Sequence, residues 1–253
     1  MSESEELSPA DVVAVVPAGG RGERLGRVLT AIPKPMAPAA GRPFVEWVVR
    51  FLGARGIRRV VLAVGHLAQV IEAHFRGGPV PGVSVSCIRE EAPLGTAGAL
   101  ANAVARSGLR PPAWLVCNGD SLALDRLDRL FAVFNRPGTD AAMLGLRLDQ
   151  PSRYGTLELD SSGMLRAFVE KRAAGGSAMV NAGVYLMREA LLSRFPARSP
   201  SSLESDVFPF LLSQGSRIAV AESAGPFLDI GTEATLPLAG EFISRNASWF
   251  LQD

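Results

Sequence analysis

The segment Val12–Val16 restricts the fold of this chain more than any other feature, because four of its five residues are valine. A continuous β-branched run is typical of a strand that is buried on both faces, as in a parallel sheet. A second apolar run, Val60–Val64, follows a segment with apolar residues at helical spacing, residues 45–55. This alternation predicts right-handed βαβ units, which build a mainly parallel sheet with helices on both faces.

The pattern continues along the chain and then changes. Further helices are expected at residues 67–75 and 96–107, and further strands at residues 83–88 and 113–117. From about residue 140 short strands predominate, and they are expected at residues 141–146, 155–159, 165–169 and 179–187. The polar turn Asp160–Gly163 joins two of them and is typical of a hairpin. We therefore expect an α/β fold with a Rossmann-like, mainly parallel sheet flanked by helices and an antiparallel β insertion in its second half.

Composition and charge exclude several classes of protein. The chain has 253 residues, 26 of them Lys or Arg and 25 Asp or Glu, so its formal net charge is +1. A general nucleic-acid or anionic-membrane binder would need a basic excess. No apolar run approaches the roughly 18 residues that a membrane span requires, and the acidic start Ser2–Glu6 is unlike a secretory signal. We therefore expect a cytoplasmic protein with no nucleic-acid or membrane partner, whose assembly into a homo-oligomer stays open.

The cysteines and histidines are expected to be structural. Cys87 and Cys117 lie in apolar runs, match no zinc spacing and act there as small hydrophobic residues. Neither His66 nor His74 has an evident Ser or Cys partner for nucleophilic chemistry.

A glycine cluster, Gly19, Gly20 and Gly22, follows the first predicted strand. Glycines there let backbone N–H groups approach phosphate oxygens without obstruction by a Cβ atom. A dinucleotide fingerprint would need glycine where Leu25 stands, and the Gly-Lys-Ser/Thr of a P-loop is absent. An NAD-binding oxidoreductase is disfavoured for this reason, and because no clear acidic residue ends a strand about 20 residues further on.

Charged residues near this cluster and at strand ends suit phosphate and metal chemistry. Arg24 lies inside the glycine-rich loop. Lys34 lies between two prolines that restrict the backbone around it. Its side chain is either a solvated cation of the loop or a partner for a phosphate group. Asp120 directly follows a predicted strand, at the sheet edge where ligands bind. Asp229 follows a short apolar run, and an Asp at such a place is otherwise a turn former or a cap.

Six motifs follow one another between residues 12 and 232: Ala18-Gly19-Gly20-x-Gly22-x-Arg24-Leu25, Pro33-Lys34-Pro35-Met36, Pro93-Leu94-Gly95-Thr96-Ala97-Gly98-Ala99, Asn118-Gly119-Asp120, Asn181-Ala182-Gly183-Val184-Tyr185 and Asp229-Ile230-Gly231-Thr232. Together they resemble those of the sugar-1-phosphate nucleotidylyltransferase family. Within it, the segments Pro33–Phe44 and Arg153–Asp160 are most similar to D-glycero-D-manno-heptose 1-phosphate guanylyltransferases. Two positions depart from the family pattern, since Glu23 replaces a usual Thr and Arg172 replaces the proline of Glu-Lys-Pro.

The resemblance implies a fold of the nucleotide-diphospho-sugar transferase type and a division of the chain. The polar start of the chain predicts a disordered tail at residues 1–10, and the resemblance implies a single nucleotidyltransferase domain at residues 11–253. The domain would comprise a nucleotide-binding half (11–120), a sugar-phosphate-binding half (121–232) and a C-terminal helix (233–253), with the helical pattern itself at 233–249. Only about 20 residues follow Thr232, so no appended acyltransferase or β-helix domain is expected.

The implied reaction transfers a nucleoside monophosphate from an NTP (GTP favoured) to a sugar 1-phosphate (D-glycero-D-manno-heptose 1-phosphate favoured) and releases pyrophosphate. Such catalysis depends on positioning and charge neutralisation, with little need for a protein nucleophile. The product would be an activated heptose for a capsule or other surface polysaccharide. The alternatives are mannose 1-phosphate with GTP, another NTP (UTP, dTTP, CTP or ATP), and an inactive, nucleotide-sensing regulatory homologue.

The family motifs also imply roles for residues. Arg24, Lys34 and Asp120 would be catalytic, and Asp120 and Asp229 would hold Mg²⁺, which often takes one or two carboxylates plus phosphates. The nucleotide would be bound by Ala18, Gly19, Gly20, Gly22, Glu90, Gly95, Thr96, Asn118 and Gly119. The sugar phosphate would be bound by Tyr154, Gly155, Glu170, Lys171 and Asn181. Glu90 would read the base, because a carboxylate accepts from both N1–H and N2–H₂ of guanine, and a one-residue shift would exchange it for Glu91.

Overall fold

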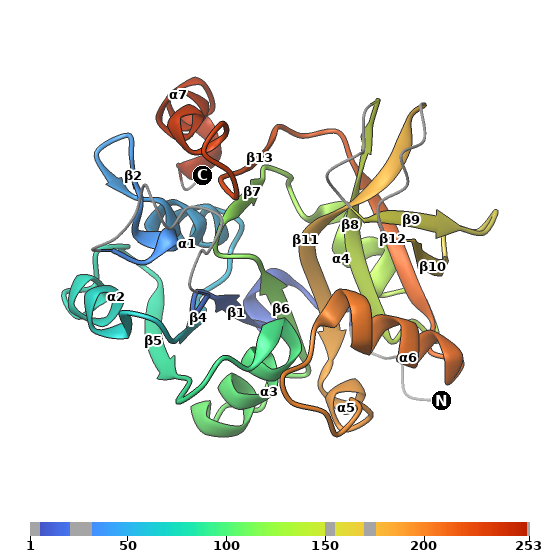
Figure 1. Cartoon of the computed structure of the whole chain (residues 1–253). Coiled ribbons are helices and arrows are strands. Elements are labelled where there is room, and N and C mark those ends of the chain that lie inside the picture. Colours follow the sequence, from blue (N-terminus) through green and yellow to red (C-terminus); the bar gives the residue numbers. More distant parts are fainter. Residues whose placement is uncertain (1–5, 21–31, 150–154, 170–175, 252–253) are drawn as a thin grey trace.

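The computed structural model describes residues 6–20, 32–149, 155–169 and 176–251 of the chain. A nine-stranded sheet runs through the middle of this described part (Figure 1). Its strands follow the order β10-β9-β11-β6-β1-β4-β5, and β8 joins β11 to β12 beside this path. The fold is therefore the α/β fold that the sequence predicts.

The first half of the sheet is parallel. It consists of β1 (Val13–Pro17), β4 (Arg59–Val64), β5 (Ser84–Arg89) and β6 (Ala113–Cys117), with β1 between β4 and β6. The connections carry α1 (Phe44–Ala54), α2 (Ala68–Phe75) and α3 (Gly95–Ser107). These are the expected βαβ units, and their bounds differ from the predicted ones by one or two residues at most.

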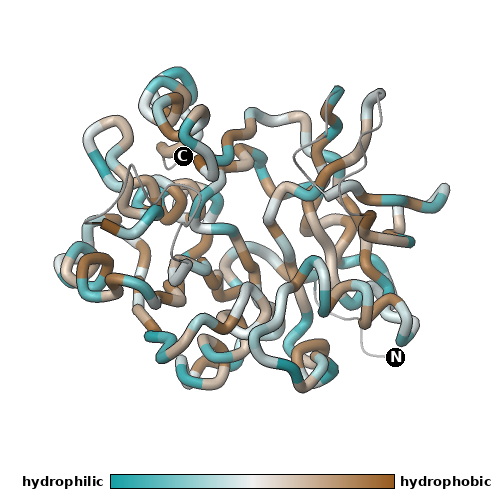
Figure 2. The backbone as a smooth tube through the Cα atoms, in the orientation of Figure 1, coloured by the Kyte–Doolittle hydropathy of each residue, from teal (hydrophilic) through white to brown (hydrophobic). Residues whose placement is uncertain are grey.

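Alternate residues of β1 belong to two apolar cores, one on each face of the sheet. Ala14 and Val16 pack in the core that includes α1, whereas Val13 and Val15 pack in the core that includes α3. All four side chains are fully buried, and a buried valine contributes about 1.5–3 kcal/mol relative to an exposed one. Neither face of this strand meets solvent, so a continuous run of apolar residues suits both. Figure 2 shows apolar residues along the central strands.

The second half of the sheet is mostly antiparallel and is organised by the long strand β11 (Ala178–Arg188). This strand pairs antiparallel with β6, β8 (Ala141–Leu148) and β9 (Thr156–Leu159). The predicted hairpin joins β9 to β10 (Leu165–Val169), and the Asp160 carboxylate closes its turn by accepting from the N–H groups of Ser162 and Met164 at 2.9 and 3.1 Å. The expected antiparallel insertion is therefore present, and it is joined by one parallel pair that the sequence did not indicate, β12 (Ile218–Ser223) with β8.

Short elements complete the described chain. Two small antiparallel sheets pair β2 (Pro38–Ala39) with β3 (Arg42–Pro43), and β7 (Ser121–Ala123) with β13 (Phe227–Asp229). Helices α4 (Asp128–Phe134), α5 (Glu189–Leu192) and α6 (Phe208–Ser213) flank the second half (Figure 1). Single turns form η1 (Pro9–Asp11), η3 (Lys34–Met36) and the π-helical η4 (Leu203–Val207). No helix among the described residues has the length and apolar character of a membrane span.

The two ends of the chain differ from the sequence expectations. The C-terminal segment is not one helix but η5 (Leu236–Leu238), α7 (Ala239–Arg245) and η6 (Ala247–Phe250). Hydrogen bonds between Thr232 and Thr235 form a turn before η5, and the backbone of Asn246 leaves the helical region after α7. The disordered tail predicted for residues 1–10 extends too far along the chain, because Leu7 is held by the Asn135 side chain. The Leu7 N–H donates to Asn135 Oδ1 at 3.1 Å, and Asn135 Nδ2 donates to the Leu7 carbonyl oxygen at 2.9 Å.

Candidate active site

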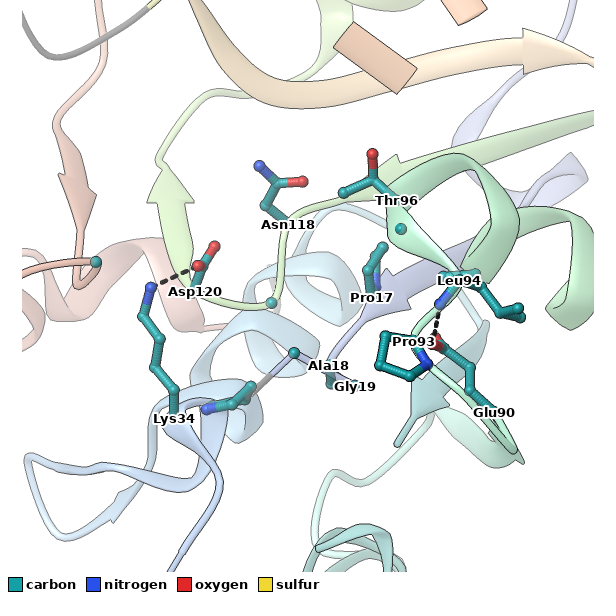
Figure 3. A pocket seen from close by; sticks show the side chains of 16 residues that line it. Pro17, Ala18, Gly19, Lys34, Glu90, Pro93, Leu94, Thr96, Asn118 and Asp120 are labelled. Carbon is teal, nitrogen blue, oxygen red and sulfur yellow. Dashed lines mark hydrogen bonds and ion pairs between the residues drawn. The ribbon is translucent and has the colours of Figure 1, made fainter. Parts of the chain in front are cut away.

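A cavity of about 690 Å³ opens at the carboxyl ends of β1 and β6, a size typical of small-molecule sites. Figure 3 shows it between the end of β1, the start of α3 and the segment that follows β6. Most of the predicted nucleotide and catalytic residues that the structure describes line it, so this cavity is the candidate site. The full lining is Pro17, Ala18, Gly19, Gly20, Lys34, Pro35, Glu90, Pro93, Leu94, Gly95, Thr96, Ala99, Asn118, Gly119, Asp120 and Gly231.

Glycines bring two backbone segments close together on the cavity floor. A Cβ atom on Gly119 would lie 2.6 Å from the Pro17 carbonyl oxygen, so the segment after β6 can pass the end of β1 only with glycine. A Cβ atom on Gly19 would lie 3.1 Å from both a Glu90 carboxylate oxygen and the Gly65 nitrogen. The glycine cluster therefore serves close packing of the cavity floor as well as leaving backbone groups accessible.

The first turn of α3 forms one wall of the cavity. Gly95 begins this 13-residue helix with φ +75°, a left-handed conformation that favours glycine. Leu94 at the N-cap makes no side-chain capping bond. Helix N-termini attract anions through their N–H groups and dipole, so this wall suits a phosphate or the carbonyl oxygen of a base.

Lys34 and Asp120 meet at the opposite side of the cavity. The Lys34 Nζ atom donates to Asp120 Oδ2 at 2.6 Å, from a side chain that is 12% exposed to one that is 40% exposed (Figure 3). Lys34 starts η3, and Asp120 stands between β6 and β7. The ammonium group thus lies inside the site, and the structure excludes the alternative of a freely solvated loop cation.

The pairing of β7 with β13 brings Asp229 to this side of the site. Asp229 lies opposite Ser121, and the Ile230 N–H donates to the Asp120 carbonyl oxygen at 3.0 Å. A Cβ atom on Gly231 would lie 2.6 Å from Asp229 Oδ1 and 3.3 Å from Lys34 Nζ, so these groups are close neighbours. Among the described residues no group of three or more His, Cys, Asp or Glu side chains is placed to hold a metal ion.

The structure places Glu90 in the cavity wall and Glu91 outside it. Glu90 follows β5, lines the cavity and accepts a hydrogen bond from the Leu94 N–H at 3.4 Å (Figure 3). Burial raises the pKa of its carboxyl group above the ordinary value, and the bond from Leu94 opposes this in part. Glu91 is exposed and does not line the cavity. Of the two candidates for base reading, only Glu90 is in place.

The predicted sugar-phosphate residues are only partly described. The predicted residues Gly22, Arg24, Tyr154, Glu170 and Lys171 lie outside the described residues. Gly155 and Asn181 are described and do not line the cavity, although the Asn181 N–H donates to the Gly155 carbonyl oxygen at 3.4 Å. Their roles therefore stay predictions.

The two cysteines and the two histidines do not line the cavity. Burial raises the pKa of the Cys87 thiol to about 11 and that of the fully buried Cys117 to about 12, so both are thiols at neutral pH. His74 Nε2 lies 2.8 Å from Glu46 Oε2, away from the cavity, and His66 is exposed. Six further residues line the cavity without a role predicted from the sequence, and all but Pro17 stand in the six motifs: Pro17, Pro35, Pro93, Leu94, Ala99 and Gly231.

The turn at Gly19 and Gly20, the N-terminus of α3 and the Lys34–Asp120 pair meet in one cavity at the carboxyl ends of parallel strands, where ligands of α/β proteins bind. The family model described as Nucleotidyl transferase matches residues 13–245. The chain therefore belongs to the nucleotidyl transferase family, which confirms the family that its motifs indicate.

Curated relatives agree with this membership. Mannose-1-phosphate guanylyltransferase of Mycobacterium tuberculosis is 34% identical over 227 residues, which are 89% of this chain and 63% of the relative. Mannose-1-phosphate guanylyltransferase catalytic subunit beta of Danio rerio is 31% identical, with coverage of 86% and 61%. The chain thus spans less than two thirds of the length of these relatives.

Solved structures match over almost their whole length. HddC from Yersinia pseudotuberculosis, crystallised with GMP-PN, has a TM-score of 0.78 and 28% identity, and the match covers 91% of this chain and 98% of HddC. A putative glucose-1-phosphate thymidylyltransferase from Bacillus anthracis has a TM-score of 0.76 at 22% identity, with coverage of 91% and 94%, and supports the fold alone.

Proposed function

We propose that this protein is a guanylyltransferase that transfers GMP from GTP to a sugar 1-phosphate and releases pyrophosphate. The observation that carries the proposal is one cavity that holds Glu90 at one end and the Lys34–Asp120 pair at the other, with a glycine floor between them. This arrangement supports binding of a base beside Glu90 and of a triphosphate along the glycine floor toward Lys34.

The protein's part in the reaction is to align anions and neutralise their charge. An oxygen of the sugar phosphate attacks the α-phosphorus of GTP while pyrophosphate departs in line, so no protein nucleophile is required. Lys34, whose ammonium group is mostly buried, is positioned to bind phosphate oxygens and to stabilise the charge that develops on the leaving pyrophosphate. The N-terminal turn of α3 and the glycines of the cavity floor hold the nucleotide.

The neighbouring carboxylates fit a magnesium ion. Asp120, directly before β7, and Asp229, in its partner strand β13, supply two hard oxygen donors, and Mg²⁺ typically takes one or two carboxylates and completes its shell with phosphates and water. We propose that these two residues hold Mg²⁺, which when bound supplies charge neutralisation to the phosphates. Asp120 also pairs with Lys34, so the two cations would share one carboxylate.

The proposed base is guanine. Glu90 is half-buried in the cavity wall and can accept from N1–H and N2–H₂ of guanine together, whereas uracil and thymine offer a single N–H between two acceptors. Adenine would bring an acceptor against the carboxylate. The two curated relatives are guanylyltransferases, and HddC was crystallised with GMP-PN.

The proposed sugar is D-glycero-D-manno-heptose 1-phosphate, which supports a role in making GDP-heptose for a surface polysaccharide. The segments Pro33–Phe44 and Arg153–Asp160 carry this preference. Mannose 1-phosphate is the second candidate, because the curated relatives are named for it. The two sugars have the same configuration around the ring and differ in the group attached to C5, so a site for one presents similar contacts to the other.

The test is pyrophosphate release across five NTPs and a panel of sugar 1-phosphates that includes the heptose, mannose and glucose compounds. We expect turnover with GTP and the heptose, weaker turnover with mannose, and loss of activity with EDTA. Equal use of GTP and ATP would overturn the guanine proposal, and a preference for mannose would establish the second candidate. Absence of turnover in every combination, with GTP still bound, would identify a nucleotide-sensing homologue.

A further inference from the structure

A hydrogen-bond network centred on Glu204 lies behind the cavity wall. Glu204 stands in η4, the π-helical turn that precedes α6. Its Oε2 atom accepts from Thr96 Oγ1 at 3.1 Å and from Ser202 Oγ at 2.7 Å, and its Oε1 atom accepts from the Tyr185 hydroxyl at 2.8 Å. Glu204 does not itself line the cavity, so it affects substrates only through the residues to which it is hydrogen-bonded.

One arm of the network, the nucleotide arm, binds the first turn of α3, which forms one wall of the cavity. Thr96 lines the cavity, and its hydroxyl donates to Glu204 while it accepts from the Leu203 N–H at 2.8 Å. A threonine hydroxyl has one hydrogen to donate, so both its position and its direction are fixed by this turn.

The backbone next to Glu204 strengthens the same arm. The Ser201 N–H donates to the Leu94 carbonyl oxygen at 2.8 Å, and the Ser201 carbonyl oxygen accepts from the Ala97 N–H at 2.9 Å. A Cβ atom on Gly95 would lie 2.3 Å from the Ser201 carbonyl oxygen. The start of α3 therefore has the segment 201–204 as its direct support.

The other arm reaches the strand of the predicted sugar-phosphate residue Asn181. The Asn181 amide group donates to the Tyr185 hydroxyl at 2.6 Å and its carbonyl oxygen accepts from the Gly183 N–H at 2.9 Å. The Gly183 carbonyl oxygen in turn accepts from the N–H of Asn118, a cavity residue, at 2.9 Å. Tyr185 is completely buried, and burial together with the Glu204 charge raises its pKa well above the ordinary value, so it remains a donor.

We propose that Glu204 is a positioning residue that fixes the nucleotide-contacting turn Leu94–Thr96 relative to β11, the strand that carries Asn181. The proposal rests on the proposed function, because it assumes that these two walls contact the two substrates of one reaction. In-line transfer requires both substrates at a defined distance, and small displacements of either reduce the rate. Glu204 provides this alignment from outside the cavity.

A carboxylate is needed at this position because all three hydroxyl partners donate. Glutamate is an acceptor at both oxygens, whereas the NH₂ group of glutamine can only donate. In Glu204→Gln the side chain has one acceptor oxygen and can satisfy only one arm in either orientation of its amide, so the link that fixes the two arms relative to each other is lost. Each arm has one hydroxyl group whose removal breaks the bond of that arm to Glu204 directly, Thr96→Val for the nucleotide arm and Tyr185→Phe for the arm on β11.

The experiment compares Glu204→Gln with the matched control Asp206→Asn. Asp206 lies in the same turn and accepts from the Ser202 N–H and from Arg198, but it touches neither Thr96 nor Tyr185. For Glu204→Gln we expect kcat/KM to fall by roughly tenfold or more for both GTP and the sugar 1-phosphate, the scale of losing a hydrogen bond to a charged group. Thr96→Val should affect mainly GTP, Tyr185→Phe mainly the sugar phosphate, and Asp206→Asn neither by more than about twofold.

Hydrogen exchange provides a readout that does not depend on catalysis. Glu204→Gln should accelerate amide exchange in residues 96–98 and 180–185 together, while Asp206→Asn should not. Equal kinetics and exchange in these two variants, or a change confined to one substrate and one arm, would overturn the positioning role. Absence of turnover in the wild-type protein would instead refute the proposed function, and the exchange comparison would still decide whether Glu204 couples the two walls.

Discussion

Replacement of Lys34 by methionine should separate catalysis from stability. Methionine keeps much of the apolar length of the side chain and removes the ammonium group that lies 2.6 Å from Asp120 Oδ2. Asp120 is 40% exposed, so the ion pair should contribute at most about 1 kcal/mol to folding. For a chain of this size that corresponds to a fall in Tm of roughly 2–4 °C.

The kinetic effect should be much larger than the effect on stability. A cation that stabilises charge on the departing pyrophosphate contributes mainly in the transition state, and removal of one such group typically reduces kcat by about 10²–10³-fold, or roughly 2.7–4 kcal/mol. We expect this loss in pyrophosphate release at saturating GTP and sugar 1-phosphate, with GTP binding weakened less.

A matched control uses an ion pair of similar length outside the cavity. Arg245 pairs with Glu241 at 2.5 Å within α7, and Arg245→Met should lower Tm to a similar small extent without changing kcat. The reasoning about Lys34 is refuted if Lys34→Met retains wild-type kcat, or if its only defect is unfolding with normal turnover in the folded fraction.

Two further predictions concern the charges around this lysine. Asp120→Asn and Asp229→Asn should each abolish turnover and leave the circular dichroism spectrum intact, because an amide keeps the shape but loses the charge that binds Mg²⁺; near-wild-type rates at saturating Mg²⁺ would remove that residue from the mechanism. The chain contains only two lysines, Lys34 and Lys171, so acetylation followed by peptide mass spectrometry reports on each separately. GTP with Mg²⁺ should protect Lys34, and labelling of Lys34 that is unchanged by the nucleotide would contradict a phosphate contact.

The parallel half of the fold was predictable because its signal is local. Each of β1, β4 and β6 is a short apolar run buried on both faces, and the helices between them show their own periodicity. Part of the cavity was predictable for a related reason, since Gly19 and Asp120 follow the ends of β1 and β6, where ligands of parallel sheets bind. The roles of Lys34, Glu90 and the start of α3 were indicated by the family motifs instead.

The features that were not predicted depend on contacts between distant segments. The parallel pairing of β12 with β8 joins residues more than 70 positions apart, Ile218 with Ala141, and nothing in either segment specifies that partner. The β7–β13 pair, which brings Asp229 beside Asp120, is equally non-local. Glu204 lies in a serine-rich segment of the sequence without clear periodicity, and only its tertiary contacts distinguish it from a surface acid.

The rarity of lysine in this sequence indicates positions where the chemistry of lysine is used. Of 26 basic residues, 24 are arginine, so arginine serves wherever a general surface cation is sufficient. Lysine presents a compact point charge with three donors, unlike the planar, forked guanidinium group. The structure places one of the two, Lys34, inside the cavity beside Asp120. This use of lysine favours a role for Lys171 as well, at the position that the family motif implies for the sugar phosphate.

Glu90 should show opposite effects on stability and on function. Burial raises the pKa of its carboxyl group above the value in the unfolded chain, so the folded protein binds the proton more tightly than the unfolded one. Ionised Glu90 therefore destabilises the folded state at neutral pH, and this penalty disappears as the pH falls below the unfolded pKa. Glu90→Gln should raise Tm at pH 7, with the difference from wild type closing toward pH 4.

The same substitution should impair recognition of guanine. The glutamine NH₂ group would face an N–H of the base, and the buried mismatch should weaken GTP use by roughly 5- to 150-fold, equivalent to about 1–3 kcal/mol, while discrimination against UTP and dTTP relaxes. Glu91→Gln is the control, because Glu91 is exposed and outside the cavity, and it should change neither Tm nor the NTP profile. Thermal melts from pH 4 to 8 and pyrophosphate release with each NTP provide both measurements. An unaltered NTP profile in Glu90→Gln would show that this carboxylate does not contact the base, whatever its effect on stability.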